Sequence, residues 1–195
     1  LGGAVLGLAA SLWLLTTVVG AGAELLVLPG LPDMPLRLTG EPLTALLAVL
    51  VAAVGALVMV YSVGYMRGES GQPRFFALMS LFMAAMQTLV LAGDWLLLLA
   101  AWEVIGFCSY LLIGFRFERT EAAGAAARAF LYTRSADLGL YLAVFLLVVR
   151  AGTSEMSATW EAGSAAAPAV GLLLLLAAMG KSAQTPLQSW LLGAM

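Results

Sequence analysis

Long apolar runs, separated by short polar or glycine- and proline-containing links, cover almost the whole chain. A helix of about 20 residues crosses the ~30 Å hydrocarbon core of a bilayer, and six runs approach or exceed that length. They are residues 1–22, 43–65, 75–92, 95–115, 129–149 and 168–192. Backbone groups in lipid must be hydrogen-bonded within their own segment, which favours helices over isolated strands. The pattern therefore predicts an all-α fold, a polytopic transmembrane bundle of about six helices.

The links predict how these helices are arranged. Residues 93–94 form a very short link, so the third and fourth helices should form an antiparallel hairpin. The links at 67–74 and 116–128 carry five arginines, whereas the opposite links carry only Arg37 and Arg150. Because Lys and Arg are enriched in cytoplasmic loops, we place the first set in the cytoplasm, and Asp33 and Asp94 outside. With no internal repeat visible, we expect one transmembrane domain over residues 1–195.

Composition agrees with the membrane class and limits the chemistry. Hydrophobic residues make up 63% of the chain and charged residues only 10%, whereas about a quarter of a soluble domain is charged. The chain has no histidine and one cysteine, Cys108, so the usual ligands of haem, zinc and iron–sulfur clusters are missing. We therefore expect no cofactor, no metal, no nucleic-acid partner and no redox or catalytic site of the chain's own.

Two charged residues lie deep in the apolar runs. Lys181, the only lysine, lies in the last run, and Glu103 lies in the fourth. At 1.5 Å per helical residue, both fall near the middle of the hydrocarbon core, where a charge is costly and usually has a partner or a function. We predict that Glu103 and Lys181 form a buried pair that transfers protons. The alternative is an ion pair that only joins two helices.

The segment around Lys181 is expected to be a broken helix. Pro186 has no N–H, so the carbonyl of Ser182 loses its helical donor, and Gly180 loosens the helix on the other side of the lysine. Discontinuous helices near the midplane bind ions and protons in transporters, and free carbonyls would then lie close to the ammonium. An ordinary proline kink is the alternative.

Arg134 and Asp137 form a second candidate group. They are three residues apart and therefore share a helix face on which they can pair. They are predicted either to belong to a secondary proton pathway, as charge-coupling residues, or only to neutralise each other.

Several motifs, in order, resemble a known family. They are Tyr65-Met-Arg-Gly-Glu69, Arg74-Phe-Phe-Ala77, Trp102-Glu103, Cys108-Ser-Tyr-Leu-Leu-Ile-Gly-Phe115, Thr133-Arg-Ser-Ala-Asp-Leu-Gly139 and Gly180-Lys-Ser-Ala-Gln184. From about Val58 to the end, their order and spacing resemble the antiporter-like L subunit of bacterial NADH:quinone oxidoreductase, respiratory complex I.

This resemblance implies a proton-translocating subunit of a translocase in the bacterial inner membrane. It implies that residues at the positions of Glu103 and Lys181 form the central pair of a half-channel. It also implies two inverted repeats of five helices, so the chain would be a fragment of a longer subunit, with most of the first repeat in residues 73–195. The implied partners are other membrane subunits, the lipid bilayer and protons, with quinone bound elsewhere in the complex.

Two other classes stay open. A multi-subunit Na+/H+ antiporter, a membrane hydrogenase or an inorganic-carbon uptake system would share the Trp-Glu and Lys-Ser-Ala-Gln elements of this chain. A structural subunit that only anchors partners to the membrane is the more distant alternative.

Overall fold

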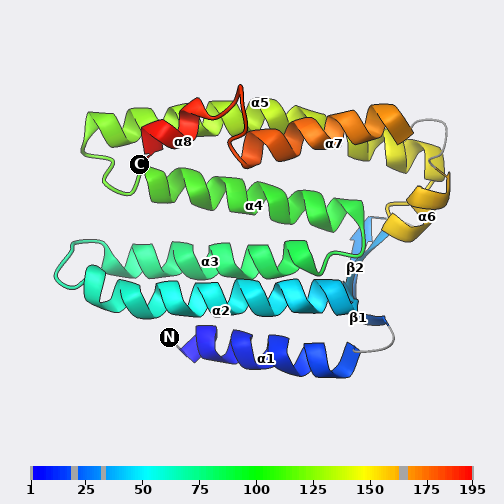
Figure 1. Cartoon of the computed structure of the whole chain (residues 1–195), viewed down its shortest axis with the longest axis horizontal. Coiled ribbons are helices and arrows are strands. Elements are labelled where there is room, and N and C mark those ends of the chain that lie inside the picture. Colours follow the sequence, from blue (N-terminus) through cyan, green and yellow to red (C-terminus); the bar gives the residue numbers. More distant parts are fainter. Residues whose placement is uncertain (1, 19–21, 32–33, 163–166, 195) are drawn as a thin grey trace. The chain divides into compact units, whose positions relative to one another are not determined.

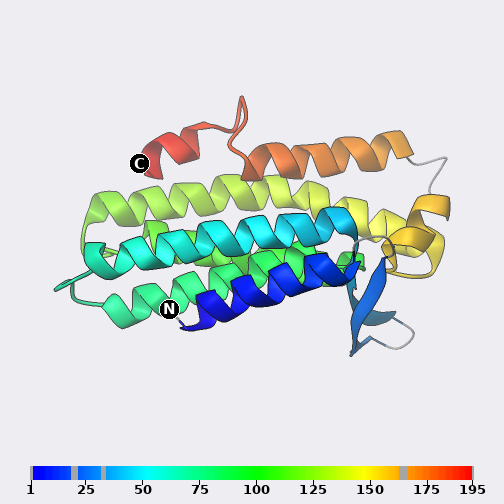
Figure 2. The same cartoon turned by 60° about the horizontal axis from the view of Figure 1, so that its bottom comes forward.

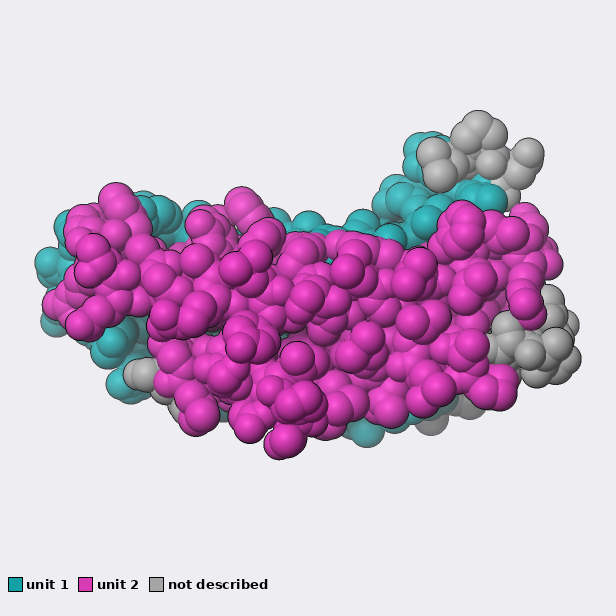
Figure 3. Space-filling model, turned by 90° about the horizontal axis from the view of Figure 1, so that it is seen from above, with its two compact units in different colours: residues 1–105 teal, residues 106–195 magenta. Residues whose placement is uncertain are grey.

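The computed structural model describes residues 2–18, 22–31, 34–162 and 167–194. Within these ranges the chain forms eight helices and one two-stranded hairpin, and it divides into two compact units, Leu1–Ile105 and Gly106–Met195 (Figure 3). The prediction of one transmembrane domain stays a prediction, and Asp33 lies outside the described residues.

The elements follow one another in a simple order (Figure 1). They are α1 (Gly2–Val18), β1 (Ala23–Leu31), β2 (Met34–Gly40), α2 (Pro42–Tyr65), α3 (Gln72–Val90), α4 (Trp95–Ile113), α5 (Thr120–Ala151), α6 (Met156–Ala162), α7 (Ala167–Lys181) and α8 (Ser189–Ala194). In the described part of the chain, α2, α3, α4 and α5 are long and apolar enough to cross a membrane. The helical membrane fold is confirmed, whereas α1 and α7 are shorter than the apolar runs that predicted them.

Three helices of unit 1, α1, α2 and α3, lie side by side. Its helix α2 packs against α1 and against α3 (Figures 1 and 2). Ala45, Ala48 and Ala52 of α2 are fully buried, and such small residues allow transmembrane helices to approach closely. Gln87 of α3 donates a hydrogen bond of 2.9 Å from Nε2 to the carbonyl of Ala48, which satisfies a polar side chain inside an apolar packing layer.

The antiparallel hairpin β1–β2 was not predicted. Its residues lie between the first predicted run, which ends at residue 22, and the second, which begins at residue 43. The alternation Leu36-Arg37-Leu38-Thr39 was the available signal, because apolar and polar residues alternate in a half-buried strand. Nearby proline and glycine residues made the segment resemble a plain link.

Asp94 connects this hairpin to the turn between α3 and α4. Its side chain is fully buried and accepts two backbone hydrogen bonds, from Leu97 N (2.8 Å) and from Arg37 N (2.7 Å). The first bond caps the N-terminus of α4, and the second fixes β2. Arg37 and Asp94 therefore lie at the same end of unit 1, as the expected topology requires.

Asp94 offers a stability test. In Asp94→Ala both hydrogen bonds are lost, and we expect unit 1 to lose about 3–6 kcal/mol of stability, since bonds to charged groups contribute about 1.5–3 kcal/mol each. Asp94→Asn keeps one acceptor oxygen and should lose about half as much. The measurement is denaturant unfolding of the purified chain in detergent micelles. An Asp94→Ala variant as stable as the wild type would contradict this role.

Unit 2 is organised around the long helix α5, against which α6, α7 and α8 pack. The helix begins at Thr120, nine residues before the apolar run that predicted it, because residues 122–129 are rich in alanine, the strongest helix former. Its N-terminal residues Ala125 and Ala126 are buried. The short helix α6, which lies in the predicted link at 151–167, was also not expected.

The predicted discontinuity near Pro186 is confirmed. Helix α7 ends at Lys181 and α8 begins at Ser189, with turns between them. Figure 1 shows this connection as a loop that leaves the surface of α5 and returns to it. The loop places the only lysine of the chain at the C-terminal end of a helix, next to irregular backbone.

Candidate functional site

The carbonyls of the last turn of α7 have hydrogen-bond donors. Ser182 N donates to Ala178 O (2.9 Å), Gln184 N donates to Met179 O (2.9 Å), and the indole Nε1 of Trp190 donates to Gly180 O (3.0 Å). Donors therefore satisfy the carbonyls of Ala178, Met179 and Gly180, whereas the expected loss of a donor to the Ser182 carbonyl stays a prediction. The loop after α7 folds back, so that its N–H groups bond to these carbonyls of the helix. The indole of Trp190 links α8 to the end of α7.

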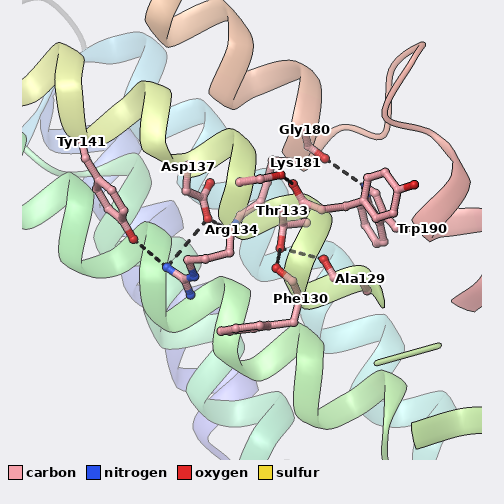
Figure 4. A network of polar contacts seen from close by, with 11 residues as sticks. Ala129, Phe130, Thr133, Arg134, Asp137, Tyr141, Gly180, Lys181 and Trp190 are labelled. Carbon is pink, nitrogen blue, oxygen red and sulfur yellow. Dashed lines mark hydrogen bonds and ion pairs between the residues drawn. The ribbon is translucent and has the colours of Figure 1, made fainter. Parts of the chain in front are cut away.

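Lys181 lies against α5, beside Asp137. Its Nζ is 3.8 Å from Asp137 Oδ2 (Figure 4), and the side chain of Asp137 is only 1% exposed. Gly180 contacts Ala136 so closely that a Cβ built on this glycine would overlap the Cβ of Ala136. Gly180 and Ala136 directly precede Lys181 and Asp137 in the sequence, so α5 and α7 approach closely where the lysine and the carboxylate lie.

Arg134 shares the same carboxylate. Its Nη1 is 3.8 Å from Asp137 Oδ2, donates a hydrogen bond of 2.7 Å to the hydroxyl of Tyr141, and its guanidinium lies over the ring of Phe130 at 5.0 Å. The expected proximity of Arg134 and Asp137 is thus present, while their role in a proton pathway stays a prediction. Sequence reasoning did not find Tyr141, a tyrosine in an apolar run with no charged neighbour on either side.

Gly106 gives the ammonium its space on the side of α4. A Cβ built on Gly106 would lie 2.8 Å from Lys181 Nζ and 3.9 Å from Arg134 Nη2, so a larger residue would force the lysine to move. Glu103 lies three residues earlier on the same helix and belongs to the other compact unit. The pairing of Glu103 with Lys181 stays a prediction.

Two cations share the carboxylate of Asp137 in this site. In their ionised forms, Lys181, Arg134 and Asp137 carry two positive charges and one negative charge. At ~4 Å and an effective dielectric constant of ~20, a unit charge pair attracts by about 4 kcal/mol. Because both cations lie 3.8 Å from the same oxygen, neither holds the carboxylate alone. The arrangement can therefore respond to small movements of either cation.

Metal ions bind to groups of ligating side chains. In residues 2–18, 22–31, 34–162 and 167–194, the structure shows no group of three or more histidine, cysteine, aspartate or glutamate side chains that could hold a metal ion. The site is thus described by its ion pairs and hydrogen bonds.

The apolar helices define a polytopic membrane protein, and a broken helix with charges at the break is a feature of membrane transporters. The chain belongs to the family described as NADH:quinone oxidoreductase/Mrp antiporter, whose transmembrane region matches residues 92–195. Residues 31–76 also match the N-terminal region described as chain 5 of NADH-ubiquinone oxidoreductase (complex I). The antiporter-like resemblance seen in the motifs is confirmed.

Named relatives are similar over most of this chain. NADH-quinone oxidoreductase subunit L of Escherichia coli (strain K12) is 44% identical over 167 residues, 82% of this chain and 27% of the relative. The subunit L of Mycobacterium tuberculosis (strain ATCC 25618 / H37Rv) is 42% identical over 159 residues, 80% of this chain and 25% of the relative. The chain therefore spans about a quarter of the length of these curated relatives.

A solved structure has the same fold. A chain of the Mrp complex from Dietzia sp. DQ12-45-1b aligns with a TM-score of 0.87 and 33% identity, covering 99% of this chain and 22% of that chain. The similarity extends over both compact units, whereas the longer of the two family matches covers residues 92–195.

Proposed function

We propose that the full-length protein is the antiporter-like L subunit of an NADH:quinone oxidoreductase and moves protons across the membrane. The support is the name shared by two relatives that are 42–44% identical over about four fifths of the chain. The motifs around Glu103, Asp137 and Lys181 occur in the order and spacing of that subunit. As a subunit of a translocase, the protein would work without a redox group in this chain.

The observation that carries the proposal is the position of Lys181 at the break after α7, beside buried Asp137. A carboxylate stabilises the charged form of a nearby lysine. Increasing their separation from ~4 to ~8 Å at a dielectric constant of ~20 weakens the attraction by about 2 kcal/mol. That difference changes the equilibrium between charged and neutral lysine about 30-fold. Movements of a few ångströms could therefore load and release a proton.

Glu103 is proposed as the second carboxylate of the proton path. The charges of Lys181, Arg134 and Asp137 add up to one net positive charge, which a further carboxylate would neutralise. Glu103 lies one helical turn from Gly106, which borders the ammonium of Lys181, and residues three apart share a helix face. The glutamate would then exchange with Asp137 as the partner of the lysine.

The setting of this proton step follows from the relatives. The proposed partners are the other membrane subunits of the complex and the bilayer of a bacterial inner membrane, with electron transfer and quinone binding elsewhere. The structural similarity to a chain of an Mrp complex favours a Na+/H+ antiporter subunit as the second candidate. A purely structural anchor would leave the charged group around Lys181 without a function.

The experiment uses inverted membrane vesicles that contain the full-length subunit in its assembled complex. NADH should drive proton uptake that an uncoupler abolishes, and deletion of the subunit should remove that uptake. A sodium gradient imposed without NADH should drive none. Proton movement driven by the sodium gradient and indifferent to NADH would instead assign the protein to the antiporter class.

A further inference from the structure

Tyr141 contacts the charged group without carrying a charge itself. Phe130, Arg134, Asp137 and Tyr141 follow each other along α5 at spacings of four, three and four, so all four lie on one face of the helix. Figure 4 shows the guanidinium of Arg134 between the hydroxyl of Tyr141 and the ring of Phe130. The two aromatic side chains, Tyr141 and Phe130, thus fix the position of the Arg134 guanidinium.

The two contacts of Arg134 Nη1 differ in strength. Its distance to the Tyr141 hydroxyl, 2.7 Å, is that of a good hydrogen bond, whereas its distance to Asp137 Oδ2, 3.8 Å, is beyond hydrogen-bond range. Arginine and carboxylate otherwise tend to form short, often bidentate pairs. The tyrosine thus gives the arginine a partner one turn beyond the aspartate and keeps that short pair from forming.

We infer that Tyr141 is a positioning residue, whose hydroxyl holds Arg134 away from Asp137 so that the carboxylate stays available to Lys181. The inference rests on the proposed function, because it concerns the group that binds the proton. The inference adds Tyr141 to the residues that control Lys181, and the tyrosine acts on the lysine only through Arg134.

The loss of the hydroxyl has a defined consequence. In Tyr141→Phe, Nη1 loses its bond to the hydroxyl while Asp137 Oδ2 remains 3.8 Å away, and the guanidinium should close onto that oxygen. The carboxylate would then be held by the arginine, and Lys181 would lose its share of the attraction. The guanidinium of Arg134 would still lie over the ring of Phe130, so the packing of α5 should change little.

The test compares Tyr141→Phe with Tyr132→Phe in the assembled complex. Tyr132 lies on the same helix and is 36% exposed, so its variant removes the same atom away from the charged group. We expect Tyr141→Phe to lower NADH-driven proton uptake about tenfold, the effect of losing one hydrogen bond to a charged group, and Tyr132→Phe to leave it unchanged. Equal uptake in the two variants would overturn the inference.

A second arm separates positioning from packing. In the Arg134→Gln background no guanidinium can close onto Asp137, so adding Tyr141→Phe should cost no further activity. In the wild-type background, infrared spectra should show a shifted carboxylate band in Tyr141→Phe, identified as the band that Asp137→Asn removes. Additive losses, or an unshifted band, would contradict the inference.

Assembly of the complex gives two further outcomes that bear on the inference. If Tyr141→Phe blocks assembly of the complex but the double variant with Arg134→Gln assembles, the damage comes from the arginine and the inference is supported. If neither assembles, the tyrosine is structural and the inference fails. The proposed function has its own test in Lys181→Ala: full proton uptake in that variant would remove the function, whatever Tyr141→Phe does.

Discussion

Replacing Glu103 with Gln, or Lys181 with Ala, should each abolish most proton transport by the full-length subunit in its complex, and the double variant should lose little more. Glu103→Gln keeps the size of the side chain but removes a negative charge that the lysine needs. Lys181→Ala removes the group that carries the proton and takes away the cation proposed for Glu103, which favours the neutral form of that carboxyl. Asp137 keeps Arg134 at 3.8 Å. Both changes break one transfer step, and residues that act as a unit give non-additive effects.

The measurement is NADH-driven proton uptake by vesicles that contain equal amounts of assembled complex. Glu118→Gln is the matched control, because it removes the same charge from an exposed glutamate in the link before α5. It should behave as the wild type. If the losses from Glu103→Gln and Lys181→Ala simply multiplied in the double variant, the two residues would not be a coupled pair.

The second large effect is expected at Gly180. A methyl group there would overlap Ala136 of α5, so α7 must move away from α5 at the residue before Lys181. Overpacking of this kind costs about 1–3 kcal/mol, and the movement would lengthen the distance from Lys181 to Asp137. We expect Gly180→Ala to lose most of its proton transport and part of its thermal stability.

Gly171 of α7 is the matched control for this substitution. Nothing lies within 4 Å of a Cβ built on Gly171, and alanine is about 1 kcal/mol better than glycine inside a helix. Gly171→Ala should therefore be as active as the wild type and at least as stable. Both variants are compared by thermal unfolding and by proton uptake in the assembled complex. Equal activity of the two variants would show that the close contact of α5 with α7 does not position the lysine.

Much of the fold follows from the length of the apolar runs, because the bilayer core sets how many helical residues it needs. The break after α7 could be predicted from Gly180 and Pro186, because glycine is a weak helix former and proline has no N–H to donate. The start of α5 could not be read, because Glu121 and Arg128 made its first turns resemble a polar link. The hairpin β1–β2 depends on bonds to the turn before α4, which are distant in sequence.

For the candidate site, too, the sequence identified some of the residues but not the contacts between them. Lys181, Arg134 and Asp137 could be found because charges are rare in apolar runs. The contact between Lys181 and Asp137 could not, since it depends on which faces of α5 and α7 meet, and residues far apart in sequence, such as Gly180 and Ala136, pack there. Trp190 and Tyr141 contribute hydrogen bonds to Gly180 and Arg134, and nothing in the local sequence distinguishes them from other aromatic residues of a membrane helix.

Proton transport is proposed to depend on Lys181, and one measurement tests this role directly. NADH oxidation and proton uptake are recorded on the same vesicles, for the wild-type complex and for Lys181→Ala. Since no cofactor is expected in this chain, we expect electron transfer to fall far less than proton uptake, so that fewer protons move per electron. An unchanged number of protons per electron in Lys181→Ala would contradict the proposal that this lysine carries protons.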